Sequence, residues 1–280
     1  MGMETADLRQ MLAFAERTAR EAGAVLKDRF GKDHDVVYKG TIDIVTEADK
    51  ASEALIAERI RTAFPEHDLL GEEGTRGIAS ASGLQWIIDP LDGTTNFAHH
   101  LPTFGVSIGL EEHGAPLLGV VFDPMRDECF CAARGLGATL NGLPIRVSMT
   151  SELIQSLLVT GFSYDRETRV KQAHLWRAFM PQVQAVRQTG SAALNLCYIA
   201  AGRFDGYWER GISAWDVAAG ACILLEAGGT ITDFAGGDYS SADRVILASN
   251  GALHPAMLKR IRMHGEFAEA DVHPDGGQTR

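Results

Sequence analysis

The chain of 280 residues has few cysteines, no long apolar run and a deficit of positive charge, and each shortage excludes a class of protein. Its four cysteines (Cys129, Cys131, Cys197 and Cys222) lack paired CxxC spacing, so we expect reduced, structural thiols instead of a disulfide scaffold. The first 20 residues are amphipathic and carry acids, so we predict neither a signal peptide nor a membrane span. We therefore expect a cytoplasmic protein with no membrane partner.

The charge balance restricts the partners further. With 37 acidic and 26 basic residues, the formal net charge is −11, and no basic stripe is available for a nucleic-acid backbone. We expect no direct binding of nucleic acid. The same negative charge disfavours an anionic substrate, unless bound cations invert the local field.

The composition is that of a globular protein, with 45% hydrophobic and 22% charged residues. Apolar spacing predicts a long first helix from about residue 8 to 30 and an antiparallel meander over residues 104–132, followed by a hairpin at Asn141-Gly142. From residue 157 to 263, strand and helix patterns alternate, as in an α/β domain. We place a boundary near Ser148, between an α+β domain (1–147) and an α/β domain (148–280).

The most informative stretch is Trp86-Ile87-Ile88-Asp89-Pro90-Leu91-Asp92-Gly93-Thr94-Thr95-Asn96-Phe97. A short apolar strand ends in two carboxylates three positions apart, and the Gly-Thr-Thr-Asn that follows suits the start of a helix. Carboxylates are preferred ligands of Mg²⁺, and free N–H groups at a helix start attract phosphate. The stretch therefore indicates metal-assisted chemistry on a phosphate ester.

Three other acidic positions admit both a structural and a functional interpretation. Asp49 follows Thr46 at capping-box spacing, the Glu72-Glu73 pair between glycines is typical of a solvated turn, and Asp216 suits a helix N-terminus. Each carboxylate can also point into a metal site. Glu72 and Asp89 follow neighbouring strand patterns, so we expect them at the same end of a sheet.

These segments together resemble the inositol monophosphatase family. The resemblance rests on Glu72-Glu73, on the Asp89–Phe97 motif and on Trp215-Asp216-Val217-Ala218-Ala219-Gly220, in this order, and extends from about Leu8 to Met263. It implies a layered αβαβα sandwich of the sugar-phosphatase type. It also implies a lithium-sensitive, magnesium-dependent phosphatase acting on phosphate monoesters, with a homodimeric assembly.

The resemblance also implies roles for individual residues. Glu72, Asp89 and the Leu91 carbonyl would bind one Mg²⁺, and Asp89, Asp92 and Asp216 a second, while a third, weaker ion would lie near Glu72. Thr94, with Asp49 behind it and Glu72 beside it, would orient and deprotonate the attacking water. The N–H groups of Gly93 and Thr94 would bind phosphate oxygens. Substrate hydroxyls would contact Asp92, Gly190, Ala192 and Glu209, and Lys39 lies near the position of a family lysine.

Other functions compete with an inositol monophosphatase. Haloacid dehalogenase phosphatases also place paired aspartates after a strand, but one residue separates them, whereas two separate Asp89 from Asp92. Histidinol phosphate, fructose 1,6-bisphosphate and 3′-phosphoadenosine phosphates are alternative substrates, because a few pocket contacts decide the choice. A regulatory protein that contacts transcription or RNA-processing machinery, or a metal-stabilised scaffold without turnover, are alternatives from other classes.

Overall fold

The computed structural model describes residues 5–32, 36–38, 44–77 and 82–264. Its elements are α1 (Thr5–Arg29), β1 (Val36–Tyr38), β2 (Ile44–Thr46), α2 (Glu47–Ala63), β3 (Asp68–Gly71), β4 (Leu84–Asp92), α3 (Thr94–Ala98), β5 (Gly105–Glu112), β6 (Ala115–Asp123), β7 (Glu128–Ala133), β8 (Gly137–Leu140), β9 (Leu143–Pro144), η1 (Leu153–Gln155), β10 (Leu157–Thr160), α4 (Arg166–Phe179), η2 (Met180–Gln182), β11 (Ala185–Arg187), α5 (Ala192–Ala200), β12 (Gly206–Arg210), α6 (Ala214–Glu226), β13 (Thr230–Thr232), β14 (Val245–Ser249) and α7 (His254–Met263).

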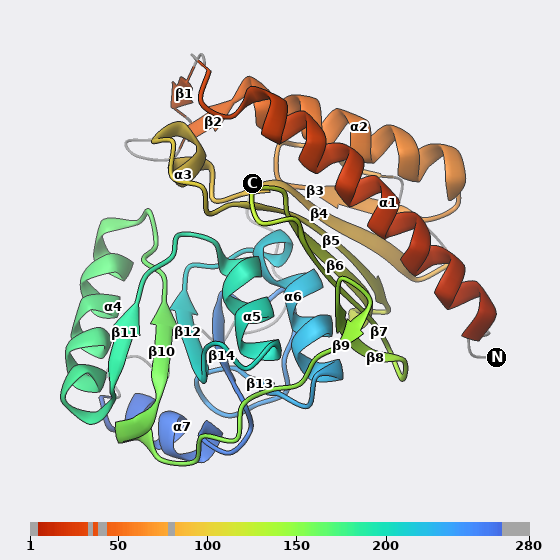
Figure 1. Cartoon of the computed structure of the whole chain (residues 1–280). Coiled ribbons are helices and arrows are strands. Elements are labelled where there is room, and N and C mark those ends of the chain that lie inside the picture. Colours follow the sequence, from red (N-terminus) through yellow and green to blue (C-terminus); the bar gives the residue numbers. More distant parts are fainter. Residues whose placement is uncertain (1–4, 33–35, 39–43, 78–81, 265–280) are drawn as a thin grey trace, which may run out of the picture.

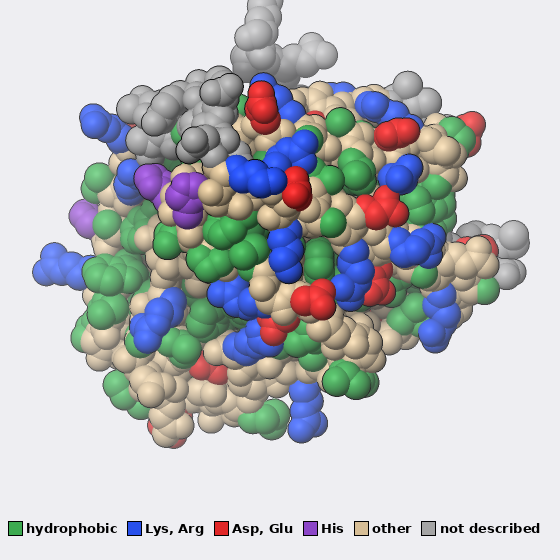
Figure 2. Space-filling view, turned by 45° about the horizontal axis from the view of Figure 1, so that its top comes forward, with side chains coloured by type: hydrophobic (Ala, Val, Ile, Leu, Met, Phe, Trp, Pro, Cys, Tyr) green, Lys and Arg blue, Asp and Glu red, His purple; other side chains and the backbone are tan. Residues whose placement is uncertain are grey.

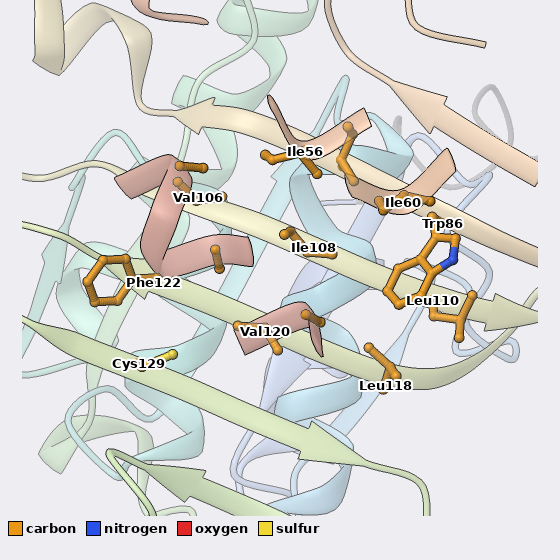
Figure 3. Close-up of a cluster of buried hydrophobic side chains, with 14 of the residues drawn as sticks. Ile56, Ile60, Trp86, Val106, Ile108, Leu110, Leu118, Val120, Phe122 and Cys129 are labelled. Carbon is orange, nitrogen blue, oxygen red and sulfur yellow. The ribbon is translucent and has the colours of Figure 1, made fainter. Parts of the chain in front are cut away.

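The elements stack in five layers (Figure 1), in which α1 and α2 cover a seven-stranded sheet, α5 and α6 lie beneath it, and a five-stranded sheet with α4 and α7 follows. Three hydrophobic clusters fill the spaces between these layers. Figure 3 shows the first cluster, where Ile56 and Ile60 of α2 lie over Trp86, Ile108 and other side chains of the sheet. The layered α+β fold is therefore confirmed.

The seven-stranded sheet has the order β3-β4-β5-β6-β7-β8-β9, and all its neighbours are antiparallel except β3 and β4. The predicted meander is confirmed, and so is the hairpin, because Asn141 and Gly142 connect β8 to β9 with positive φ angles of 49° and 78°. Since β3 and β4 run in parallel, their carboxyl ends meet at one edge of the sheet. Glu72 and Asp89 lie at that edge.

The five-stranded sheet has the order β11-β10-β12-β14-β13 and mixes parallel and antiparallel pairs. Helices α5 and α6 pack in the central layer and contact both sheets. The alternation of strands and helices predicted after residue 157 is confirmed. The division into domains 1–147 and 148–280 stays a prediction.

The outer surface of the first helical layer carries mixed charges, and Figure 2 shows basic and acidic side chains interspersed on the face turned toward the viewer. Arg59 of α2 pairs with Glu21 of α1 at 3.0 Å, and Arg20 pairs with Glu16 one turn away at 3.1 Å. Exposed pairs of this kind contribute about 0–1 kcal/mol each. The helices are therefore held mainly by their apolar faces.

Candidate metal-dependent active site

A pocket of about 540 Å³ opens where the end of β4, the start of α3, the N-termini of α5 and α6 and the strand β12 meet. Ten of the residues that line it were singled out from the sequence: Glu72, Asp89, Leu91, Asp92, Gly93, Thr94, Gly190, Ala192, Glu209 and Asp216. They come from both sheets and from the helical layer between them. The folded chain thus brings together segments that are more than 140 positions apart.

An irregularity in β4 allows both of its aspartates to reach this pocket. Residues three apart in a regular strand point to opposite faces. Asp89 pairs with Ser107 and Asp92 with Gly105, so β4 contains one more residue than β5 over this interval. Pro90, which has no N–H for the ladder, stands within this bulge. The extra residue offsets the alternation, and Asp89 and Asp92 both line the pocket.

The Asp92 carboxylate is held at the N-terminus of α5. Ser191 Oγ donates to it at 2.5 Å, and the N–H groups of Ala193 and Ala192 donate at 2.8 and 3.2 Å. Burial raises the pKa of Asp92 to about 6, although these hydrogen bonds act in the opposite direction. Asp92 therefore connects the seven-stranded sheet to the central helical layer.

Asp216 occupies the third position of α6, in a capping box with Ser213, whose N–H donates to it at 2.7 Å. Burial and the neighbouring Asp92 raise its pKa well above the usual value. Burial and the charges of Glu72, Asp92 and Asp216 likewise raise the pKa of Asp89. Asp216 thus belongs to the capping box of α6 and also lines the pocket, where four carboxylates repel one another.

This donor set fits hard divalent cations. Carboxylate and carbonyl oxygens are the ligands that Mg²⁺ prefers, and a cation would relieve the repulsion between the acids. Arg169 is the one basic side chain among the described residues that line the pocket. Among the described residues, only Glu16, Cys129 and Cys131 bring three potential ligand atoms within 4.8 Å of one another, so the pocket carboxylates are more widely spaced.

Thr94 and Asp49 form a buried pair at the side of the pocket. Thr94 Oγ1 lies 3.0 Å from Asp49 Oδ1 and 3.1 Å from the Leu91 carbonyl oxygen. Asp49 Oδ2 accepts hydrogen bonds from the Thr46 N–H at 2.8 Å and from Thr46 Oγ1 at 2.5 Å, within the predicted capping box. Burial raises the pKa of Asp49. Asp49 thus takes part in the capping box of α2 and also accepts a hydrogen bond from Thr94.

Glycines shape the loops around the predicted phosphate site. Gly93 precedes α3 with φ 102°, and a Cβ there would lie 3.0 Å from the Thr103 carbonyl oxygen. Gly190 has φ 85°, and a Cβ there would lie 2.7 Å from Nδ2 of Asn96. That Asn96 nitrogen donates to the carbonyls of Thr103 and Thr189, at 2.7 Å each. The positive φ angles and the crowding by neighbouring atoms therefore require glycine at both positions, whether or not a phosphate binds there.

The two glutamates of the Glu72-Glu73 turn have different surroundings. Glu72 lines the pocket, whereas the N–H of Glu73 donates to the buried Glu53 carboxylate at 2.7 Å. The other oxygen of Glu53 accepts from the Thr75 N–H at 2.9 Å. Glu53 therefore holds the turn that directs Glu72 inward. Lys39 lies outside the described residues.

Glu209 lies on β12 and accepts a hydrogen bond from Tyr207. Its burial raises its pKa to about 7, although the hydrogen bond from Tyr207 lowers it. A Cβ at Gly161 would contact the Glu209 carboxylate, so the glycine provides room for this side chain.

Several pocket residues were not predicted from the sequence, and Tyr164 and Arg169 are among them. The Tyr164 hydroxyl lies 3.4 Å from Thr95 Oγ1, across the pocket entrance, and Arg169 Nε donates to the Ser163 carbonyl at 3.0 Å. Both follow the carboxyl end of β10, a parallel strand. Since α/β folds bind ligands beyond the carboxyl ends of such strands, the polar segment after Thr160 was a usable signal.

The fold and the acidic pocket define a metal-dependent phosphatase class, and comparison with known proteins specifies it. The inositol monophosphatase family matches residues 7–266, and the chain belongs to this family. It is 45% identical to the inositol-1-monophosphatase of Synechocystis sp., over 91% of this chain and 90% of that protein. It is also 42% identical to the Nus factor SuhB of Salmonella typhimurium, over 90% of this chain and 96% of that protein.

Solved structures agree with this assignment. An inositol monophosphatase from Anabaena (Nostoc) sp. superposes with a TM-score of 0.83 at 46% identity, covering 92% of this chain and 97% of that one. The extragenic suppressor protein SuhB from Bartonella henselae gives 0.87 at 36% identity, covering 90% and 98%. The family supports a phosphatase activity. None of the described helices is long and apolar enough to cross a membrane.

Proposed function

We propose that this chain is a magnesium-dependent phosphatase that hydrolyses inositol monophosphates, such as inositol 1-phosphate, to myo-inositol and phosphate. The observation that carries the proposal is the Thr94–Asp49 pair, which lies beside an acidic pocket whose oxygen donors suit Mg²⁺. Glu72, Asp89, Asp92, Asp216 and the Leu91 carbonyl would hold two or three ions. When bound, these would supply positive charge against the attacking and leaving oxygens of an in-line displacement.

The residues of the chain would move the proton. The Thr94 hydroxyl has one hydrogen and two acceptors within 3.1 Å, Asp49 and the Leu91 carbonyl. When it donates to Asp49, its own lone pairs are free to accept a hydrogen bond from a water in the pocket. Thr94 then takes the proton of the attacking water as its own proton passes to Asp49. Hydroxide would attack phosphorus as the P–O ester bond breaks, and the leaving alkoxide would take a proton from a water in the pocket to become the inositol hydroxyl. No covalent enzyme intermediate would form.

The remaining predicted residues would bind the substrate. The first N–H groups of a helix lack acceptors within it, so those of Gly93 and Thr94 would donate to phosphate oxygens. Asp92, Gly190, Ala192 and Glu209 would contact ring hydroxyls, and all four line the pocket. Lithium inhibition and a homodimer are further predictions that follow from the family.

Replacing Thr94 tests this proposal. Thr94→Ala removes the hydroxyl that connects water to Asp49, and we expect kcat to fall by about 10²–10⁴-fold, as for loss of a general base. Thr62→Ala is the matched control, because Thr62 lies exposed on α2. Mg²⁺ binding and the unfolding temperature should be retained in both variants. Equal phosphate release by Thr94→Ala and Thr62→Ala would contradict the proposed proton path.

A second candidate function is a regulatory role in transcription, favoured by the relatives named Nus factor SuhB at 42–43% identity. The Thr94→Ala variant separates the two roles. If a strain that lacks its own Nus factor of this family regains normal transcription with Thr94→Ala, the regulatory role is supported independently of hydrolysis. Failure of both the parent chain and the variant to restore it would argue against this role.

A further inference from the structure

A second group of potential metal ligands lies away from the pocket, between α1 and β7. Cys129 and Cys131 on β7 have their Sγ atoms 3.6 Å apart, and Glu16 projects from α1 toward them. One carboxylate oxygen and the two sulfurs all lie within 4.8 Å of one another. The described part of the chain contains no other such group.

The strand geometry explains the pairing of the thiols. Alternate residues of a strand share a face, so both cysteines point to the side that α1 and α2 cover, while Phe130 between them points to the central helical layer. Figure 3 shows Cys129 on this covered face, beside Phe122 and Val120. Both thiols are buried, whereas Glu16 is partly exposed and forms the side from which an ion could enter.

The charges around the thiols are mixed, because Glu16 raises the pKa of Cys131 and Arg20 lowers it. Arg20 contacts Glu16 at 3.1 Å, and it has a second carboxylate partner, Asp127, at 3.2 Å. Burial disfavours its charge, but the carboxylates of Glu16 and Asp127 favour it, and the pKa of Arg20 is raised. Arg20 can therefore release Glu16 to a metal and keep its contact with Asp127.

We propose that Glu16, Cys129 and Cys131 form a binding site for a soft divalent cation of the zinc and cadmium type, which would fasten α1 to β7. With a zinc–sulfur distance of about 2.3 Å, sulfurs 3.6 Å apart subtend roughly 100° at the metal, near the tetrahedral angle. Glu16 supplies a third ligand, and solvent on its exposed side completes the set. The site differs in chemistry from the all-oxygen pocket, which suits hard cations.

Binding requires the thiols to lose protons. The hydrogen bond between the thiols and their burial raise the pKa of Cys131, so this group is protonated before the ion arrives. The ion would displace one proton from each thiol to solvent, since thiolates are its ligands. Neither oxidation nor reduction is involved.

A cadmium titration tests the proposal on the full chain. The protein is kept reduced with a phosphine under nitrogen, and excess Mg²⁺ occupies the carboxylate pocket. Cd²⁺ should produce the ultraviolet thiolate-to-cadmium absorption, saturating at one ion per chain, and should raise the unfolding temperature. Zn²⁺ should compete for the same site. Since the readout is thiolate absorption, it is independent of whether the pocket hydrolyses a phosphate ester.

Substitutions of the three proposed ligands test which of them bind the ion. The double variant Cys129→Ala/Cys131→Ala should lose the band, and Cys222→Ala, which changes another buried thiol, should keep it. Glu16→Gln lies at the surface and should fold, and we expect it to weaken binding by about tenfold or more. Absence of the band in the reduced parent chain, or its survival in the double variant, would overturn the site. An unchanged affinity in Glu16→Gln would overturn the role of Glu16.

Discussion

The Asp92 carboxylate accepts a hydrogen bond from Ser191 Oγ at 2.5 Å, although the two residues are 99 positions apart. Asp92 ends β4 of the seven-stranded sheet, and Ser191 is the N-cap of α5 in the layer beneath. One contact therefore orients a predicted metal ligand and also fixes the helix whose first residues line the pocket. Ligand geometry and the packing of two layers depend on the same hydroxyl.

Removing that hydroxyl should lower the affinity for Mg²⁺ more than it lowers the stability of the fold. Ser191→Ala leaves the Ala192 and Ala193 N–H groups on Asp92, so the carboxylate stays in place but loses its shortest hydrogen bond. We expect the Mg²⁺ concentration for half-maximal activity to rise about tenfold, and an unfolding cost of about 1 kcal/mol for the lost cap. Ser191→Thr keeps a hydroxyl and should recover most of the Mg²⁺ affinity. Equal Mg²⁺ dependence in all three proteins would contradict the role given to Ser191.

Neutralising one of the mutually repelling acids should make the metal-free protein more stable. A carboxyl group whose pKa is higher in the folded than in the unfolded chain favours folding at low pH, and this contribution is lost as pH rises through the folded pKa. Asp89, Asp92 and Asp216 all have raised pKa values. In chelator at pH 7.5, Asp89→Asn should therefore unfold a few degrees higher than the parent chain, and this difference should shrink toward pH 4.

The same substitution should have the opposite consequence for function. Asp89→Asn should remove most hydrolysis, and Mg²⁺ should raise its unfolding temperature less than that of the parent chain. Asp238→Asn, at an exposed position, is the matched control and should change neither property. A lower unfolding temperature of Asp89→Asn in chelator would show that the acids do not repel as described.

Glu209 should make substrate affinity depend on pH near neutrality. Its pKa of about 7 means that it is neutral below this pH and becomes a carboxylate above it. Since a carboxylate is the stronger acceptor for a hydroxyl, KM for inositol 1-phosphate should fall as pH rises from 6 to 8. Glu209→Gln should flatten this trend. As a control, KM of the parent enzyme for an aryl phosphate without ring hydroxyls should not fall with pH. If the pH profile of KM for inositol 1-phosphate were the same in Glu209→Gln as in the parent enzyme, the assigned contact would be excluded.

Gly93 should be more sensitive to a side chain than a glycine in open space. Gly93→Ala combines an unfavourable φ of 102° with a contact of 3.0 Å to the Thr103 carbonyl, and we expect a loss of roughly 1–3 kcal/mol in the free energy of unfolding. Gly135→Ala has a φ of 76° with no atom within 4 Å, and it measures the conformational cost alone. The difference between the two variants in the free energy of urea unfolding gives the cost of the contact with Thr103. Equal losses would show that Thr103 adjusts without cost.

Local patterns were sufficient to predict several elements and the acidic motif. The Thr46–Asp49 capping box, the meander and the Asn141-Gly142 hairpin depend on neighbours in sequence, and the structure contains all three. The motif around Asp89 indicated carboxylate and phosphate chemistry because its residue types and order are themselves the signal. Its family resemblance was confirmed by comparison.

Features that depend on long-range pairing were not predictable in this way. The bulge that directs Asp89 and Asp92 to one side is a property of the β4–β5 register, although Pro90 was a local clue to it. Tyr164 reaches Thr95 only because two sheets meet at the pocket, and the proximity of Ser191 to Asp92 has the same origin. The position of Cys129 and Cys131 beside Glu16 likewise depends on the packing of α1 on β7.

The most direct test of the central claim is phosphate release from inositol 1-phosphate with Mg²⁺, with chelator and with added lithium. Histidinol phosphate, fructose 1,6-bisphosphate and 3′-phosphoadenosine 5′-phosphate are measured in parallel. We predict turnover that requires Mg²⁺, is suppressed by lithium and has its highest kcat/KM on inositol 1-phosphate. A higher kcat/KM on another ester would contradict the proposed substrate, and hydrolysis of none of the four would contradict the proposed enzyme.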